Sequence, residues 1–424
     1  MDIVYACCAG LDVHKKTVVA CVRRVAADGK VHKEVRTFGT MTAELLELAD
    51  WLVQEGVTHA AMESTGVYWK PVWNILEDQI ELLLVNARHI KQVPGRKTDV
   101  KDSEWIAELL QHGLLRGSFV PPVPQRELRE LTRQRMQLLH QKASVANRIQ
   151  KILEDANIKL ASVATDVLGK SGRDMLRALS AGQDNPEVLA ELAQRKLRAK
   201  IPQLQVALHG RVTEHHRFLL KLLLDQVMQL EELIERLSAR IVAVLPKPVA
   251  KEVLRLVEIP GIAERAAENI VAEIGTNMEQ FPSAGHLSSW VGISPGNNES
   301  AGKRKSGRTT KGNQWLRATL VQVAWAASHT KASYLAAQYR RLAGRRGKKR
   351  ALVAVAHSIL VIIYHLLQKP ETNYRDLGPE YLDRLQSKQL TKHLVRRLEQ
   401  LGHKVTLEPV TEPKLTEAVA GHHP

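Results

Sequence analysis

The first third of the chain alternates short β-patterned segments with helical ones. Apolar and polar residues alternate along three successive segments, and Ala27-Asp28-Gly29-Lys30 between the last two is a typical hairpin turn. An amphipathic helix ended by Gly56 comes next, followed by a strand, a helix, a strand and a helix. The predicted strands are 5–12, 17–23, 31–38, 58–62 and 81–85, and the predicted helices are 42–54, one from residue 68 and one after residue 102.

The order of three strands, helix, strand, helix, strand, helix is the one that an RNase H-like mixed sheet requires. We therefore predict an α/β first domain over residues 1–120. Pro121-Pro122-Val123-Pro124 interrupts the pattern directly afterwards and marks a domain boundary.

Beyond these prolines the apolar residues recur at helical spacing. Two long stripes, 128–152 and 218–245, predict an antiparallel coiled coil within a helical domain of residues 121–246, acting as a spacer or dimerisation element. The insertion between the stripes is less regular. We expect its helices to break at Gly172, Gly182 and Pro186.

A third, all-α domain is predicted over residues 247–370. Pro260 and Gly261 lie in an apolar turn before a helical stretch at 266–274, an arrangement that resembles a helix-hairpin-helix. Such a turn presents backbone N–H groups to a DNA phosphate, although a turn between helices without a ligand would look similar. The apolar run 353–367 contains two histidines and a serine and reads as a buried core helix. Residues 371–424 are predicted to be a basic helical tail with a disordered end.

The composition indicates a polyanionic partner. Lys and Arg number 61 against 45 Asp and Glu in 424 residues, which gives a net charge of +16. This surplus favours nucleic acid, because bound phosphates release counterions. We find no run of about 18 apolar residues and no signal-peptide pattern, which argues against a membrane protein. Cys7, Cys8 and Cys21 lack metal-binding spacing and are predicted to be reduced, packed thiols of a cytosolic protein.

Four carboxylates lie where a strand should end or a helix begin. Asp12 and Glu63 follow β-patterned segments, and Asp99 and Asp102 are three residues apart, on one face if a helix opens there. Mg²⁺ prefers oxygen ligands and keeps several waters, so this set suits it better than a His or Cys cage would. Any one of these acids alone reads equally well as a surface charge or a helix cap. The set in this order predicts a metal site.

Residues 294–317 carry six Lys or Arg and one acid among Gly, Asn and Ser, a composition that predicts a flexible loop. Ser300 beside three consecutive cations has the surroundings of a nucleophile, because the cations stabilise charge on phosphoryl oxygens. A second basic run before residue 351 reads equally as a solvated face or as phosphate contacts. The predicted nucleic-acid contacts are Pro260, Gly261, Lys303, Arg304, Lys305, Arg308, Lys311, Arg345, Arg346, Lys348 and Lys349.

Together these motifs resemble the DEDD transposases of bacterial insertion sequences, the insertion-sequence-110 family, over roughly residues 5–370. The resemblance rests on Gly10-Leu11-Asp12-Val13, Met62-Glu63-Ser64-Thr65-Gly66, Lys97-Thr98-Asp99, Asp102, Ile259-Pro260-Gly261-Ile262 and the Ser300 loop that ends in Lys311-Gly312-Asn313.

The resemblance implies a RuvC-like first domain, a coiled-coil middle and a C-terminal transposase domain. It also implies a bacterial cytoplasmic recombinase, nucleoid-associated when active, that is guided by an element-encoded RNA. The enzyme would assemble on donor and target DNA as a homo-oligomer, from dimer to tetramer.

By motif match, Asp12, Glu63, Asp99 and Asp102 would bind Mg²⁺, and Ser300 would form a covalent phosphoserine link with DNA. Many relatives have Gly directly after the serine. Here Ala301 intervenes, and Ser306-Gly307 is the alternative pair.

Because the acids and the serine are nearly two hundred residues apart, the predicted active site is composite, and we consider that it is shared between protomers. The main alternative is a RuvC-type structure-selective nuclease that uses water as the nucleophile. A non-catalytic nucleic-acid scaffold is a further alternative. A sugar-kinase or actin-like ATPase is disfavoured, because paired glycine-rich phosphate loops are absent from the sequence.

Overall fold

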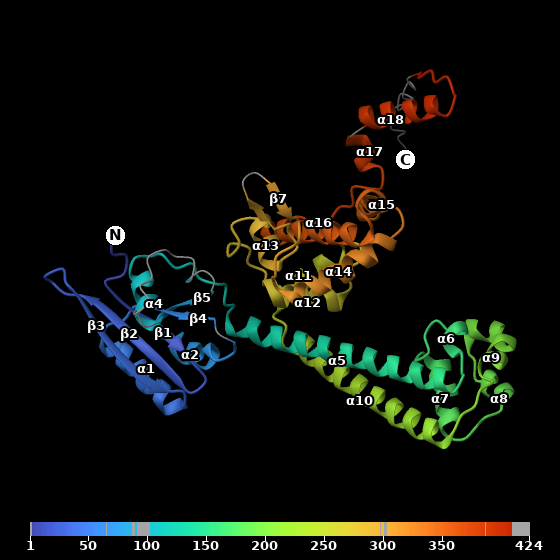
Figure 1. The fold of residues 1–424 in the computed structure, drawn as a ribbon, viewed down its shortest axis with the longest axis horizontal. Helices are drawn as coiled ribbons and strands as arrows, with labels where there is room; N and C mark the ends of the chain where they lie inside the picture. The colour runs from blue at the N-terminus through green and yellow to red at the C-terminus, as the bar shows by residue number, and fades with distance from the viewer. Residues whose placement is uncertain are drawn as a thin grey trace, which may run out of the picture. The chain divides into compact units, whose positions relative to one another are not determined.

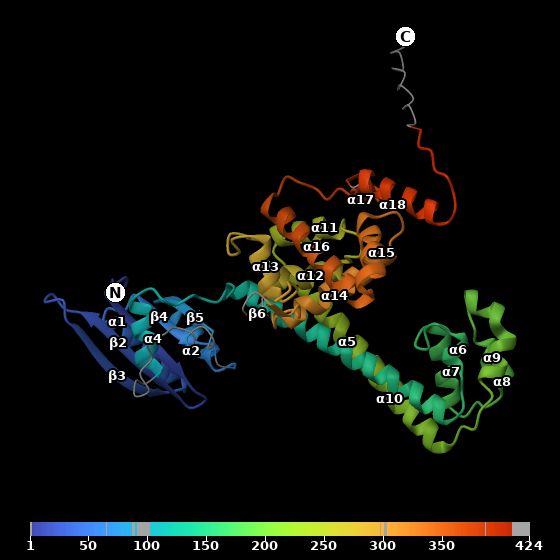
Figure 2. The same cartoon turned by 45° about the horizontal axis from the view of Figure 1, so that its top comes forward.

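The computed structural model describes residues 2–64, 66–86, 90, 102–296, 298–300, 303–385 and 387–408, and at 298–300 and 303–306 it describes the backbone only. The chain divides into two compact units, Met1–Pro122 and Val123–Pro424 (Figures 1 and 2). The finer division predicted at residues 246 and 370 stays a prediction.

The first unit is built on a five-stranded mixed sheet with the strand order β3-β2-β1-β4-β5. The first three strands form an antiparallel meander, and β4 and β5 run parallel to β1. This arrangement confirms the predicted α/β fold. The elements are β1 Cys7–Val13, β2 Thr17–Val25, β3 Val31–Gly39, α1 Thr42–Gln54, β4 His59–Glu63, α2 Trp69–Leu76, β5 Glu81–Val85 and α4 Asp102–Gln111.

Different helices pack against the two faces of the sheet. Leu11 and Met62 point to a core shared with α1 and α2, whereas Cys8 and Ala61 point to a core shared with α4. Side chains of a strand alternate between faces, so β1 and β4 are buried on both sides. Gly56, which was predicted to end this helix, has a φ of 73° and follows the end of α1.

Gly10 explains how closely α4 approaches the sheet. A Cβ placed on Gly10 would lie 2.3 Å from the backbone nitrogen of Ala107 and 2.3 Å from the carbonyl oxygen of Ser103. Only a residue without a side chain lets the helix backbone cross β1 at this distance. Cys8 and Cys21 are buried free thiols, as predicted, and burial raises their pKa values to about 12 and about 11.

The second unit opens with two long helices, α5 Val123–Asp155 and α10 Glu214–Val244. Leu128 and Ile241 share one small core near one end of the pair, and the other end is joined by His216 and Asp155, with Nε2 and Oδ2 2.8 Å apart. These contacts show that the helices are antiparallel, as Figure 1 also shows. Supercoiling of the pair stays a prediction.

Short helices cap the far end of this pair: α6 Leu160–Val163, α7 Lys170–Ser180, α8 Pro186–Glu191, the 3-10 helix Arg195–Lys200 and α9 Ile201–Ala207. Gly182 and Pro186 separate α7 from α8, as predicted. The prediction of a break at Gly172 was wrong, because this residue lies inside α7 and a Cβ there would lie 2.1 Å from the Val167 carbonyl oxygen. Close packing, and not helix ending, accounts for this glycine.

A bundle of helices forms the rest of the unit. Its elements are α11 Lys247–Val257, α12 Glu264–Ile274, α13 Ala284–Val291, β6 Asn298–Ser300, β7 Lys303–Ser306, α14 Gln314–His329, α15 Tyr334–Arg346 and α16 Lys348–Gln368, followed by α17 Tyr381–Leu385 and α18 Ser387–Gln400. The basic C-terminal helix is therefore present, whereas the predicted disordered end falls mostly on residues 409–424, outside the described residues.

Among the described residues, α16 is long and apolar enough to cross a membrane by length and composition. Its residues Val355, Ile359 and Ile363 are fully buried, and the helix contacts α13, α14 and α15. We therefore interpret α16 as the core helix of this bundle, in agreement with the sequence prediction.

The prediction that residues 294–317 form a flexible loop was wrong where β6, β7 and the start of α14 lie. Strands β6 and β7 form an antiparallel hairpin, and α14 begins at Gln314. A pairing of Pro295 with Thr309 extends the hairpin at its base. Backbone pairing creates these strands, and it leaves no hydrophobic signature in a sequence rich in Lys, Ser and Gly.

Candidate functional site

Asp12 and Glu63 end neighbouring strands at the same edge of the first unit's sheet. The parallel pairing of β1 with β4 aligns Leu11 with Met62, and each acid is the next residue on its strand. Asp12 is two residues after Gly10 and Glu63 is two residues after Ala61, so each acid lies on the same face of the sheet as that residue. Gly10 and Ala61 both face α4. The strand register therefore brings both carboxylates to the α4 face of the sheet.

Asp102 joins them as the first residue of α4. The next residue, Ser103, lies directly over Gly10, two positions before Asp12. The remaining member of the predicted set, Asp99, lies outside the described residues. Three of the four predicted acids are thus brought to one edge by a strand register and a helix crossing.

The electrostatics of Asp12 reflect this gathering. Burial raises the pKa of the Asp12 carboxyl, His14 lowers it, and the charges of Asp102 and Glu63 raise it further. His14 Nε2 lies 3.1 Å from Asp12 Oδ2. Sequence reasoning did not assign His14 a role, although its place two residues after Asp12 was visible. Its proximity to Asp12 in the sequence was the available signal.

We expect Asp12→Asn to stabilise the protein at neutral pH when divalent metal is removed with EDTA. Because the folded-state pKa is raised, the native state holds the proton more tightly than the unfolded chain does. Stability from this group is therefore present at low pH and is lost as pH rises through the folded-state pKa. Thermal unfolding should show an advantage of the variant that grows from about pH 4 to pH 7.

The matched control for that experiment is Asp78→Asn, which neutralises an exposed carboxylate. It should leave the midpoint of unfolding unchanged across the same pH range. A variant at Asp12 that is no more stable than wild type at pH 7 would contradict the expected cost of the buried charge.

These acids suit a hard divalent cation by their chemistry. They offer only oxygen donors, and their mutual repulsion is the kind that a bound cation relieves. Within the described part of the chain, no group of three His, Cys, Asp or Glu side chains is close enough to enclose an ion. With Asp99 outside that part, the full predicted set is not tested by this geometry.

In the second unit, the backbone of the hairpin places the two candidate serines at opposite ends. Ser300 pairs with Lys303, and this pair is the one next to residues 301–302 at the tip. Ser306 pairs with Asn298 nearer the base. The structure describes the backbone but not the side chains of Ser300, Lys303, Arg304, Lys305 and Ser306, so the predicted roles of these residues stay predictions.

The base of the hairpin is anchored by glycines. A Cβ on Gly312 would lie 2.4 Å from the carbonyl carbon of Val291, and one on Gly292 would lie 2.7 Å from the carbonyl oxygen of Thr310. The segment after β7 therefore packs backbone to backbone against the end of α13. This contact explains why glycine precedes Asn313 in the Lys-Gly-Asn motif.

Asn313 then connects the hairpin to a buried charge. Its Oδ1 accepts hydrogen bonds from the backbone N–H groups of Trp315 and Leu316 and caps α14, while its Nδ2 donates to Glu273 Oε2 at 2.6 Å. Glu273 also accepts two hydrogen bonds from Arg133 of α5, at 2.6 and 2.8 Å. Sequence reasoning missed Glu273, because a helical glutamate carries no local sign of burial.

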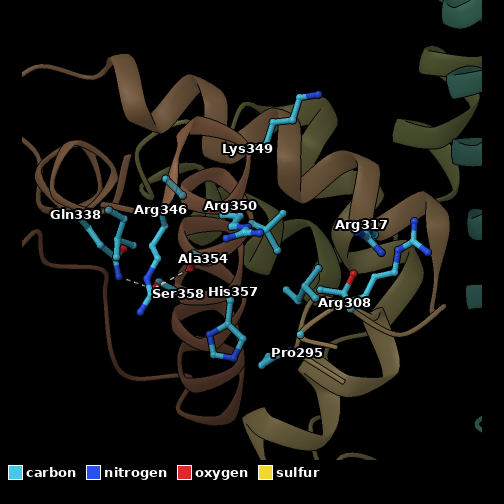
Figure 3. Close-up of a pocket in the computed structure, with 16 residues that line it drawn as sticks. Pro295, Arg308, Arg317, Gln338, Arg346, Lys349, Arg350, Ala354, His357 and Ser358 are labelled. Atoms are coloured by element: carbon cyan, nitrogen blue, oxygen red, sulfur yellow. Dashed lines mark hydrogen bonds between the residues drawn. The ribbon is translucent and has the colours of Figure 1, made fainter. Parts of the chain in front are cut away.

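The predicted basic contacts only partly come together. Arg308, Arg346 and Lys349 line one cavity, accompanied by Arg317 and Arg350, which were not among the predicted contacts (Figure 3). The other predicted cations with described side chains, Lys311, Arg345 and Lys348, are exposed and do not line it.

The turn between α11 and α12 has a structural explanation of its own. Gly261 has a φ of 90°, and a Cβ there would lie 2.5 Å from the Val323 carbonyl oxygen on α14. The glycine is needed for this conformation and close approach. Contact of Pro260 and Gly261 with DNA stays a prediction.

Comparisons with known proteins match both units. Residues 9–158 match a family model for the DEDD transposases of IS110, described as a transposase, and residues 254–340 match one described as the transposase IS116/IS110/IS902 family. The transposase for insertion sequence element IS1111A of Coxiella burnetii (strain RSA 493 / Nine Mile phase I) is 26% identical over 297 residues, which cover 68% of this chain and 72% of the relative. The first match contains all four predicted acids, and the second contains the hairpin.

Proposed function

Because the chain belongs to the DEDD transposases of the IS110 family, enzymes that cut and rejoin DNA, we propose that it recombines DNA through a covalent serine link. The observation that carries the proposal is the gathering of Asp12, Glu63 and Asp102 at one edge of the sheet. The mixed sheet is proposed to be RNase H-like, of the RuvC type. Its strand order and parallel β1-β4-β5 half support this assignment.

The proposed role of Asp12, Glu63 and Asp102, with Asp99, is to hold Mg²⁺. When bound, the cation supplies Lewis-acid stabilisation of negative charge on the scissile phosphate and on the leaving 3′-oxygen. The protein contributes a partly buried carboxylate in Asp12, whose raised pKa reflects the cost of leaving its charge unneutralised. The exposed side chain of His14 contacts this carboxylate.

The proposed nucleophile is Ser300. Its hydroxyl oxygen forms a bond to the phosphorus while the bond from phosphorus to the 3′-oxygen breaks, the hydroxyl proton is lost, and the leaving 3′-oxygen takes up a proton. Reversal by a 3′-hydroxyl from another strand rejoins DNA and releases the serine. Lys303, opposite Ser300 in the hairpin register, is proposed to stabilise negative charge on the phosphoryl oxygens.

An element-encoded RNA is proposed to choose the DNA sites by base pairing. The protein would then read mainly backbone and shape, for which a net charge of +16 is suited. We also propose a homo-oligomer in which acids and serine of different protomers cooperate. Helices α11 and α12, which contact each other, are proposed to bind DNA as a helix-hairpin-helix.

Mixing two inactive proteins tests this proposal. Asp12→Ala and Ser300→Ala should each lose DNA joining while both still bind DNA, because each lacks a different part of the machinery. Mixed together with Mg²⁺ and the element's RNA, they should recover part of the wild-type rate. The measurement is the yield of joined DNA strands on a denaturing gel.

The control mixture pairs Ser300→Ala with the exposed-site variant Asp78→Ala, which should join DNA by itself. DNA joining by Asp12→Ala or Ser300→Ala alone would contradict the proposed chemistry. Two inactive variants that bind DNA but stay inactive when mixed would contradict only the sharing of residues between protomers.

A further inference from the structure

A cavity of about 1190 Å³ lies between the base of the hairpin and helices α14, α15 and α16 (Figure 3). Arg308 and Pro295 come from the hairpin base and Arg317 from α14. Arg346 and Gln338 come from α15. The wall formed by α16 contributes Lys349, Arg350, Ala354, His357 and Ser358.

Within the part of the chain that the structure describes, the charge lining this cavity has one sign. Five cations and no carboxylate line it there. Within the described residues, Arg317, Arg346, Lys349 and Arg350 form no ion pair, and the first turn of α16 has no side-chain cap. Uncapped helix N–H groups add positive potential to that of the side chains. An anionic ligand would relieve the repulsion among these groups.

Two neutral polar side chains line the cavity beside Arg346 (Figure 3). Gln338 Nε2 donates a hydrogen bond to Ser358 Oγ at 2.9 Å, and Ser358 Oγ donates to the Ala354 carbonyl oxygen at 3.3 Å. Gln338 Oε1 is buried and has no hydrogen-bond donor among the described residues. Burial lowers the pKa of the adjacent His357 and so favours its neutral form. An N–H donor from a ligand would satisfy the glutamine oxygen.

We propose that this cavity binds one unpaired nucleotide of a nucleic-acid strand, with its phosphate at the arginines and its base edge at Gln338. The proposal rests on the proposed function in that nucleic acid is the polyanion. Phosphate alone offers no donor for the glutamine oxygen, and a base inside a duplex has its pairing edge occupied. The volume is slightly above the ~300–1,000 Å³ of typical small-ligand sites.

A second cavity lies next to the first. It has a volume of about 670 Å³, shares His357 and Ser358 with the first cavity, and contains Tyr334, Tyr374 and His365. Aromatic rings beside a basic groove are the usual surface on which successive bases of a single strand stack. This arrangement favours a single strand over a double helix as the ligand.

Fluorescence anisotropy with the full chain tests the proposal. The probes are fluorescein-labelled single-stranded DNA and RNA dodecamers of one sequence, the matching DNA duplex, and a DNA dodecamer with abasic sites. Arg317→Ala/Arg350→Ala should weaken binding to a single strand at least tenfold and lower its salt slope by about 0.7, the amount that one single-strand phosphate contact accounts for. Gln338→Leu should weaken binding to the normal strand several-fold and leave the abasic probe unchanged.

The matched control, Arg236→Ala/Arg240→Ala, removes the same charge from exposed positions on α10. It should change single-strand affinity less than threefold. Weakening with the DNA probe, the RNA probe or both supports the proposal and identifies the source of the strand. Cavity variants that bind as wild type does, or that lose duplex affinity equally, overturn it, provided that circular dichroism shows unchanged melting. Wild-type DNA joining, assayed separately, shows whether the proposed function itself has failed.

Discussion

Replacing Ser300 with alanine is expected to abolish the covalent attachment of DNA and to lower strand joining by about 10⁴-fold or more. The change removes one oxygen, and without it no protein atom is left to form the bond to phosphorus. The measurement is the amount of protein-linked DNA that survives boiling in detergent, together with the yield of joined strands. DNA binding should change little, because the cations of the hairpin remain.

Ser306→Ala is the matched control, since it removes a hydroxyl from the other end of the same hairpin. It should retain joining. If Ser306→Ala is inactive and Ser300→Ala is active, the nucleophile is Ser306. If Ser300→Ala still cleaves DNA without forming a covalent link, water is the nucleophile, and the structure-selective nuclease replaces the recombinase as the better reading.

Glu273→Ala is expected to destabilise the second unit by roughly 3–5 kcal/mol, because it leaves buried cations without their partner. Arg133 donates two hydrogen bonds to this carboxylate, and Arg129 also approaches it. Burial lowers the pKa of Arg129 to about 10, and the charge of Glu273 opposes that shift. At about 2–4 °C per kcal/mol, the midpoint of thermal unfolding should fall by about 6–20 °C.

The control is Glu235→Ala, which removes the partner of Arg265 from an exposed ion pair between the same two parts of the unit. Exposed pairs contribute about 0–1 kcal/mol, so its midpoint should move only slightly. Equal losses in the two variants would contradict the buried network. Glu273→Gln, which keeps an acceptor for Asn313 but removes the charge, should fall between wild type and Glu273→Ala.

Much of the fold followed from local patterns. The predicted helix 42–54 and strand 81–85 have the observed boundaries, and the five predicted strands are all present. Amphipathic periodicity reports which residues one element buries, and that information lies within a few residues of the chain. Backbone pairing does not have this property, which is why the hairpin that carries Ser300 was mistaken for a loop.

The candidate site was predicted in part for the same reason. Asp12, Glu63 and Asp102 could be found because strand ends and helix starts are visible in sequence. Glu273 and Gln338 could not, because their burial depends on partners 140 and 20 residues away. The cluster of cations around the cavity likewise gathers residues from three separate segments, at Arg308, at Arg317 and within 346–350.

The amino-acid order alone thus determined the strands and helices of the first unit, the excess positive charge, the acids at strand ends and the likeness to DEDD transposases. Tertiary structure decided that α4 crosses β1 at Gly10, that Asn313 meets Glu273, and that Arg317, Arg350 and Gln338 line one cavity. The physical reason is the separation along the chain over which each kind of interaction acts. Periodicity and turn chemistry act between near neighbours, whereas close packing and buried charge are satisfied only by groups that folding brings together.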